Sequence, residues 1–388
     1  MPSARIGEPV VAGFPPVAVV TDSTAALTAE EAAAAGVTVV PLHVLIDNEE
    51  FTEGVDVEPA QVIEAIRKNR RVSTSRPSPA VLLDRYERLA AGGAQAVVSA
   101  HLSGQLSGTC DGATLAAREA PVPVDVVDTA STGLALGYAV LAAARGAGGA
   151  GSAGSGGRGE DSEASDAGDA SDAGERARRL GEEIRSRCAR TTVLCYVHSL
   201  DQLRRGGRIG AAASLLGSAL AIKPIIALTR GHVEPVARLR TSGRALARLT
   251  DLAVESVEAL RAEAAVGVGV DGATSGAAGG EDAVGSGAGG HVAVVTPAED
   301  APHGNAPDPS STASSSAEPV AGGVRIAVHH ADALERAERL AADLRERCAV
   351  PAGEGGEPVP PPVQVRELPA VLAVHLGPGT IAVVVAPA

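Results

Sequence analysis

A segment rich in hydroxyl groups, residues 73–79, is the first feature of the sequence that could bind an anion. It reads Ser-Thr-Ser-Arg-Pro-Ser-Pro, so four hydroxyls and one guanidinium precede a helix that Pro79 could begin. Hydroxyl groups and backbone N–H groups at the start of a helix form a cradle for a carboxylate or a phosphate. A polar linker is the alternative interpretation, and the segment alone does not decide between the two.

A second hydroxyl-rich segment, residues 102–109, lies between an expected strand and an expected helix. In its sequence LSGQLSGT, Gly104 and Gly108 allow the backbone to approach a ligand closely, and Ser107 and Thr109 can donate hydrogen bonds to an anion. The segment is not an ATP-binding P-loop, because the GK[ST] ending is absent. The GxSxG pattern of a serine-hydrolase elbow occurs nowhere in the chain, which weakens a hydrolase interpretation.

An aspartate and a histidine far apart in the sequence are candidates for ligand binding or proton transfer. Asp22 and Ser23 follow an apolar run at 17–21, and ligands approach a parallel sheet at the carboxyl ends of its strands. Both residues could instead cap the turn and helix that follow. His375 lies in the sequence HLGPGT, which predicts a rigid turn between two strands. Its ring could donate to a carboxylate or move a proton, or it could be purely structural.

Arginines gather at two further places. Residues 203–209 read LRRGGRI and join three arginines, Arg208 among them, to a double-glycine turn. Arg238 and Arg240 lie two residues apart at the end of an expected strand, and hence on one face of it. Such groups could clamp an anion or dock a partner, although a solvated basic turn is the alternative.

The composition favours neither a metal site nor a disulfide framework. Four cysteines are scattered without a CxxC pair, and the nine histidines show no metal-ligand spacing. We therefore expect no cofactor, no metal and reduced thiols in a cytoplasmic protein. The N-terminus lacks the pattern of a signal peptide. The apolar runs at 133–144 and 209–222 are shorter than the roughly 20 residues of a membrane span, so we expect no integral membrane association.

The elements that must position these residues follow an α/β pattern. Strand-like and helical segments alternate along the first part of the chain, which predicts a mainly parallel sheet. The apolar, strand-like runs are at 17–21, 37–43, 96–100 and 124–128, and the helical patterns are at 28–35, 59–69, 79–91, 107–118 and 132–145. A hairpin at 224–238 and further strands at 191–197, 324–328, 363–368 and 381–385 predict a second, mixed sheet. Helices are expected at 175–188, 242–265 and 331–347, with a helical region through 220.

The negative charge of the chain is concentrated in three segments. The formal net charge is −14, which by itself argues against nucleic acid as a partner. Residues 146–174, 267–323 and 351–362 hold fifteen of the 47 acids and one of the 33 bases, so the rest of the chain is neutral and the charge does not exclude an acidic ligand. Their composition predicts disorder. We expect an N-terminal α/β domain at 1–145, an insertion at 146–174 and a C-terminal α/β domain at 175–388 that contains the other two.

Taken together, the order and spacing of these motifs resemble the DegV family. The resemblance is carried by TDSTAALT (21–28), VPLHVLID (40–47), STSRPSP (73–79), LSGT (106–109), VVDTAS (126–131), LRRGGRI (203–209), IKPIIALTRGHVEPVARLRT (222–241), IAVHHADALERAERL (326–340) and HLGPG (375–379). The match covers essentially the whole chain outside the three acidic segments. Arg76, where the family commonly has Gln, Cys110, where it has Tyr, and Thr129, where it has Ser, depart from the usual pattern.

The resemblance implies a two-domain α/β protein whose C-terminal domain is the lipid-binding domain. Such proteins hold one long-chain fatty acid in an apolar tunnel and present it to a separate ATP-dependent kinase subunit, whose acyl phosphate product feeds phospholipid synthesis. The protein itself would not be an enzyme. The family's carboxylate-binding positions fall on Thr74, Ser75, Ser107 and His375. Basic positions near the head group or facing the kinase fall on Arg208 and Arg240. Arg76, which follows Thr74 and Ser75 in the sequence, could join them by adding a charge to the head-group site, or it could face solvent.

Three further interpretations accompany the resemblance. The aliphatic stretch 209–226 is a candidate for part of the tunnel wall, with ordinary core packing as the alternative. A hydrolase or transferase that uses Asp22, the hydroxyl cluster and His375 is a different function for the same residues. The second alternative function is that of a regulatory protein, which senses lipid and acts through protein contacts alone.

Overall fold

The computed structural model describes residues 15–148, 166–215, 222–270, 323–351 and 356–388. The chain divides into two compact units, Met1–Glu263 with Val320–Ala388, and Ala264–Pro319. Only the last turns of one helix are described in the second unit. All elements around the candidate site belong to the first unit.

A four-stranded parallel sheet forms the first layer, as the alternating pattern predicts. Its order is β2-β1-β6-β7, with bounds β1 (Val17–Asp22), β2 (Val37–Val40), β6 (Ala96–His101) and β7 (Val124–Asp128). Successive side chains of a strand point to opposite faces. Accordingly, Val17 and Val19 pack in one core cluster and Ala18 and Val20 in another, so the sheet is buried on both sides.

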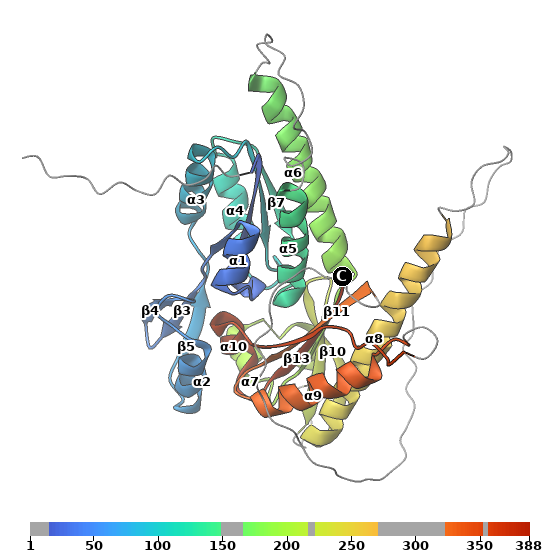
Figure 1. Ribbon diagram of the computed structural model, residues 1–388. Coiled ribbons are helices and arrows are strands. Elements are labelled where there is room, and N and C mark those ends of the chain that lie inside the picture. Colours follow the sequence, from blue (N-terminus) through green and yellow to red (C-terminus); the bar gives the residue numbers. More distant parts are fainter. Residues whose placement is uncertain (1–14, 149–165, 216–221, 271–322, 352–355) are drawn as a thin grey trace, which may run out of the picture. The chain divides into compact units, whose positions relative to one another are not determined.

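Five helices accompany this sheet: α1 (Ala29–Ala35), α3 (Pro79–Ala91), α4 (Thr109–Ala117), α5 (Leu134–Gly148) and α6 (Asp166–Ala189). Helices α3 and α4 lie together on one face and α5 and α6 on the other (Figure 1). Helix α6 is longer than the predicted helix at 175–188. It begins at Asp166, inside the expected insertion, and Ala177 and Ile184 pack into the core of the parallel sheet.

A six-stranded mixed sheet forms the second layer and confirms the predicted α/β fold. Its order is β10-β9-β8-β13-β11-β12, with only β11 and β12 parallel. The strands are β8 (Thr192–Tyr196), β9 (Lys223–Thr229), β10 (His232–Leu239), β11 (Val324–His330), β12 (Val363–Glu367) and β13 (Ile381–Pro387). The predicted hairpin is present, and Arg230 and Gly231 take the positive φ values of 49° and 83° that a tight two-residue turn requires.

The mixed sheet has two differently covered faces. Helices α8 (Ser242–Val270) and α9 (Leu334–Arg347) pack on one face. On the other face lie α5, α7 (Asp201–Gly206) and a short 3-10 turn, η2 (Gly210–Leu215). A second 3-10 turn, η1 (Ser23–Ala25), follows β1. The face of the mixed sheet that meets α5 therefore also meets the first layer.

A small antiparallel sheet, not predicted from the sequence, completes the fold. Its order is β4-β3-β5, with bounds β3 (His43–Ile46), β4 (Glu49–Thr52) and β5 (Val72–Ser75), and α2 (Pro59–Arg67) accompanies it. The run 37–43 was predicted as one strand, but β2 ends at Val40. Pro41 has no N–H to donate, and the N–H of Leu42 donates to Oγ of Ser23 over 3.0 Å instead of to a neighbouring strand.

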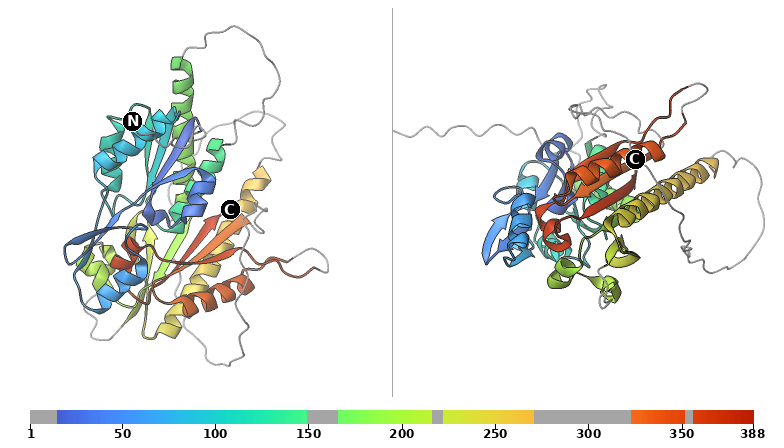
Figure 2. Two further views of the ribbon diagram at one scale, coloured as in Figure 1. Left: turned by 60° about the vertical axis from the view of Figure 1, so that its left-hand side comes forward. Right: turned by 90° about the horizontal axis from the view of Figure 1, so that it is seen from below.

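Helix α10 (Ala370–Leu376) corrects the prediction for His375, which lies in the last turn of a helix and not in a turn between two strands. Gly377 ends the helix with φ of 78°. Helix α10 packs against α2, α7 and the three-stranded sheet, and the further views show it (red) beside the blue strands (Figure 2).

The acidic segments are only partly described. Residues 149–165, 271–322 and 352–355, where disorder is predicted, lie outside the described residues. Within the described parts, α8 continues to Val270, and Val359 forms an isolated β-bridge with Val350 through two hydrogen bonds of 2.8 and 2.9 Å. These parts therefore carry secondary structure, and disorder in the rest of the acidic segments stays a prediction. The division into domains at 145 and 175 stays a prediction.

Candidate functional site

A cavity of about 360 Å³ lies where the three sheets meet. Its volume falls in the range of small-molecule sites, roughly 300–1,000 Å³. Its wall consists of Leu42, Thr74, Ser75, Arg76, Leu102, Leu106, Ser107, Gly108, Thr132, Val193, Cys195, Leu203, Arg208, Ile226, Ala227, Leu228, Val233, Val371, Leu372, His375 and Leu376. Six of the seven residues predicted for the site are therefore brought together on one cavity.

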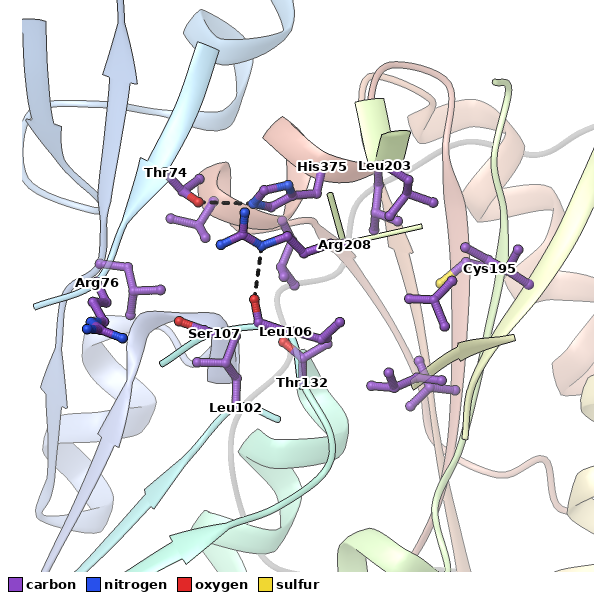
Figure 3. A pocket seen from close by; sticks show the side chains of 18 of the residues that line it. Thr74, Arg76, Leu102, Leu106, Ser107, Thr132, Cys195, Leu203, Arg208 and His375 are labelled. Atoms are coloured by element: carbon purple, nitrogen blue, oxygen red, sulfur yellow. Dashed lines mark hydrogen bonds between the residues drawn. The ribbon is translucent and has the colours of Figure 1, made fainter. Parts of the chain in front are cut away.

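The polar end of the cavity is organised by a hydrogen bond between Thr74 and His375. Strand β5 directs Thr74 toward helix α10, and Oγ1 of Thr74 lies 3.0 Å from Nε2 of His375 (Figure 3). The two residues are 301 positions apart in the sequence. Nδ1 of His375 is buried and has no hydrogen-bond partner among the described residues. A hydroxyl and an imidazole thus face each other. While this bond is kept, a neutral ring leaves one of the two groups free to donate to an anion, whereas an imidazolium leaves both.

The electrostatics of this end favour a neutral histidine. Burial, and after it the positive charge of Arg208, lower the pKa of His375 from 6.5 to about 4. Gly206 lies so close that a Cβ there would stand 2.4 Å from Nδ1 of His375. An anionic ligand would act in the opposite direction, because a negative charge beside the ring stabilises the imidazolium form.

Arg208 ties two segments of the cavity wall together. Its Nε donates to the carbonyl oxygen of Leu106 over 3.0 Å, and its Nη1 donates to that of Gly206 over 2.6 Å. The half-buried guanidinium therefore links helix α7 to the loop that follows β6. Ser107 lies in the same loop, where its hydroxyl is 2.9 Å from that of Thr109. This leaves Ser107 able to donate to a ligand while it accepts from Thr109.

Ser75 and Arg76 also line the cavity but are oriented differently. The hydroxyl of Ser75 donates to Oε1 of Glu50 over 3.2 Å, so it would have to release this carboxylate to donate to a ligand. Arg76 is exposed and reaches over Gly108, on the side of Ser107 away from His375 (Figure 3). A side chain at position 108 would occupy the space of this guanidinium.

Arg240 is not part of the cavity wall. It follows strand β10 and is exposed to solvent. The structure therefore separates it from the other six predicted residues.

The remainder of the cavity is apolar. Val193 and Cys195 of β8, Ile226 and Leu228 of β9, and Leu203 of α7 supply much of this wall. Burial raises the pKa of the Cys195 thiol to about 12, so the group is uncharged. None of the Phe or Tyr residues that the structure describes contributes to this wall, in agreement with the aliphatic composition.

The predicted wall segment 209–226 contributes less than expected. Of its described residues, only Ile226 lines the cavity. Ala212 and Leu215 pack in the core between α7 and the mixed sheet. The alternative interpretation, ordinary core packing, holds for these two residues.

Thr132 is a residue of the site that the sequence did not single out. It lines the cavity, and its buried Oγ1 has no hydrogen-bond partner among the described residues. Its position could have indicated this role. Thr132 follows β7, at the same edge of the parallel sheet as the loop after β6, which also lines the cavity.

Asp22 belongs to a separate, fully buried network. Its carboxylate accepts hydrogen bonds from the N–H of Leu102 over 2.9 Å and from Thr24 Oγ1 over 2.6 Å, and lies 3.0 Å from Nδ1 of His101. Nε2 of His101 lies 2.8 Å from Oγ of Ser99. This Ser-His-Asp chain has the order of a catalytic triad, but all three side chains are completely buried and none lines the cavity. Asp22 and His375 therefore do not form one cluster.

Two further properties bear on the chemistry. Within the ranges that the structure describes, no group of three or more His, Cys, Asp or Glu side chains is placed to hold a metal ion. No helix in those ranges is long and apolar enough to cross a membrane.

The fold and the cavity define an α/β protein with an amphipathic cavity where its sheets meet. A family model described as "Uncharacterised protein, DegV family" matches residues 16–152 and 156–283. A DegV domain-containing protein of Streptomyces coelicolor is 36% identical over 369 residues, which are 95% of this chain and 98% of the relative. The chain belongs to the DegV family.

Solved structures agree with this assignment. A DegV family protein from Thermus thermophilus, described by its fatty acid binding, is 26% identical, with a TM-score of 0.63 over 96% of this chain and 99% of that one. DegV from Bacillus subtilis, described as a fatty acid binding protein, is 22% identical with a TM-score of 0.64 over 96% and 99% of the two chains. At 22% identity, the similarity to the Bacillus subtilis protein shows a shared fold and no more.

Proposed function

We propose that the protein binds one long-chain fatty acid in this cavity. The acyl chain would lie along the aliphatic wall, and the carboxylate would lie among Thr74, Ser75, Ser107 and His375. The observation that carries the proposal is the amphipathic character of the cavity, in which hydroxyl and imidazole donors occupy one end and Leu, Ile, Val and Cys side chains the rest. The fatty acid binding of the relative from Thermus thermophilus supports it.

The two ends of the cavity would contribute differently to binding. Burial of each methylene group is worth about 0.8 kcal/mol, so the acyl chain supplies most of the affinity. The head group adds orientation, since a buried carboxylate must keep its hydrogen bonds. Neutral donors such as Thr74 and Ser107 satisfy it, while the half-buried Arg208 attracts it without a fully buried counter-charge.

We further propose that the bound acid is presented to a separate ATP-dependent kinase subunit in the cytoplasm. A carboxylate oxygen would attack the γ-phosphorus of the partner's ATP, the bond to the bridging oxygen would break, and ADP would leave, which forms an acyl phosphate for phospholipid synthesis. The exposed Arg76 and Arg240 are suited to contact such a partner. In this scheme the phosphotransfer groups belong to the kinase, and the protein described here supplies the substrate.

The first test is the identity of the bound molecule. The purified protein is denatured, and the released material is analysed by mass spectrometry beside a mock purification. We expect about one fatty acid per chain. If no acyl chain is released, and delipidated protein takes up none, the carrier function is wrong.

The second test concerns the kinase. A candidate catalytic subunit and ATP are added to the loaded protein, and acyl phosphate is trapped with hydroxylamine as the hydroxamate. Product formation that depends on both proteins supports presentation to a kinase. Binding without product, across the kinases of the source organism, favours the lipid-sensing alternative.

A further inference from the structure

Three basic side chains from three different elements converge outside the cavity. His198 follows β8, Lys223 begins β9, and Arg336 lies on α9. Nζ of Lys223 is 3.1 Å from Nε2 of His198 and 3.3 Å from its Nδ1. His198 and Arg336 also flank Gly379, because a Cβ there would lie 3.4 Å from Nη2 of Arg336 and 3.7 Å from Cβ of His198. None of the three lines the cavity.

The charge of this cluster is not balanced by acids among the described residues. Among the described residues, no ion pair includes Lys223 or Arg336. By contrast, the neighbouring Arg339 pairs with Glu335 on the same helix. Burial, then Lys223 and then Arg336, lower the pKa of His198, and burial and Arg336 lower the pKa of Lys223. Every charged neighbour that shifts either group is therefore positive.

We propose that His198, Lys223 and Arg336 form a second ligand site, which binds an anion of the phosphate class. An ammonium, a planar guanidinium and an imidazole can each donate to a different oxygen of a phosphoryl group, and the anion would offset their mutual repulsion. The site is compact and partly accessible, since Lys223 and Arg336 are half-buried and His198 is exposed. This geometry fits one small dianion better than an extended polyanion, which needs a stripe of basic residues. The proposal is independent of the fatty-acid site.

The chain allows a direct test because it contains only two lysines, Lys68 and Lys223. Lys68 is exposed and pairs with Glu64 over 2.5 Å, so it serves as the control within the same molecule. The full chain is acetylated under limiting reagent in sodium phosphate or in sodium chloride of equal ionic strength, and the two lysines are quantified by peptide mass spectrometry. At ten times the dissociation constant, phosphate should slow acetylation of Lys223 about tenfold and leave Lys68 unchanged. Equal rates in both salts, or equal slowing of both lysines, would overturn the proposal.

Methyl phosphate distinguishes the two sources of the phosphoryl group. Protection of Lys223 by inorganic phosphate alone assigns the site to the free ion. Protection by both assigns it to a phosphoryl group that can be carried on a larger molecule. Protection by neither overturns the proposal.

A pair of variants on one helix provides the second test. Arg336→Gln should weaken phosphate binding, measured by calorimetry, about tenfold or more, because a charge-assisted hydrogen bond is lost. Arg339→Gln, one turn further along α9, should leave it unchanged. Both variants should retain the fatty-acid content of the parent protein, which separates this site from the cavity. Equal phosphate affinity of the two variants would rule out Arg336 as a ligand of the site.

Discussion

Replacing Gly206 with alanine tests the head-group arrangement without altering any of its donors. A Cβ at this position would stand 2.4 Å from Nδ1 and 2.9 Å from Cε1 of His375, much closer than non-bonded atoms approach. The imidazole must therefore turn or retreat, and its 3.0 Å hydrogen bond to Thr74 is lost. Gly206 closes helix α7, where alanine has the higher helix propensity, so the fold itself should not be weakened by the change.

The expected effect is a large loss of fatty-acid affinity. A hydrogen bond to a charged group is worth about 1.5–3 kcal/mol. Misplacing His375 should therefore raise the dissociation constant roughly 10- to 150-fold. Contacts of the acyl chain with the mixed sheet are not disturbed, so residual binding should remain.

The assay is displacement of a fluorescent fatty acid from delipidated protein. Gly243→Ala is the matched control, since a Cβ there has open space and the position lies at the start of α8. In the parent protein, NMR should also show the pKa of His375 rising from about 4 when the ligand carboxylate binds. If Gly206→Ala binds as tightly as Gly243→Ala, His375 does not hold the head group and the reasoning is refuted.

Three further predictions concern pH, the buried network and chain length. Burial lowers the pKa of His329 from 6.5 to about 4, so the unfolded chain takes up its proton first, and the free energy of unfolding should fall as the pH decreases from 6.5 to 4. The contribution is at most about 3 kcal/mol, and urea titrations of His329→Gln should show a shallower pH dependence. Asp22→Ala removes an acceptor shared by His101 and Leu102 and should cost about 3–5 kcal/mol in urea unfolding; a loss below about 1 kcal/mol would contradict the role assigned to this network. Cys195→Phe should narrow the apolar end and shift preference to shorter acids, by about fourfold in affinity for each methylene excluded, at 0.8 kcal/mol each. An equal loss for every chain length would place Cys195 away from the tail.

The two main sheets could be predicted because their sequence signals are strong. Apolar runs such as β1 and β6 alternate with helices, which favours parallel pairing. The small sheet was missed because β4 begins with two exposed glutamates and lacks the alternation that marks a half-buried strand. Helix α10 was missed because the seven residues between Pro369 and Gly377, six of them apolar, fit a buried strand as well as a short helix.

The site was only partly predictable for a related reason. The hydroxyls of Thr74 and Ser107 stand out in the sequence, since several polar donors gather before a helix. The apolar wall does not, because the face on which Val193 and Cys195 lie depends on the register of β8 against β9 and β13. A shift of one residue would exchange these side chains with Leu194 and Tyr196, which pack on the opposite face.

The two ends of the cavity differ in the size of the elements that carry them. The apolar end is built on β8 and β9, interior strands of a six-stranded sheet. The polar end depends on β5, an edge strand of the smallest sheet, and on α10, a helix of seven residues, which meet through a core cluster of their own. Because Thr74 and His375 face each other only when these two small elements are packed, head-group recognition should be lost by local rearrangements that leave the tail-binding wall intact. In the proposed function, an acyl chain on the large sheet and a carboxylate on the small elements would let the protein keep its ligand while the head group is exposed to the kinase.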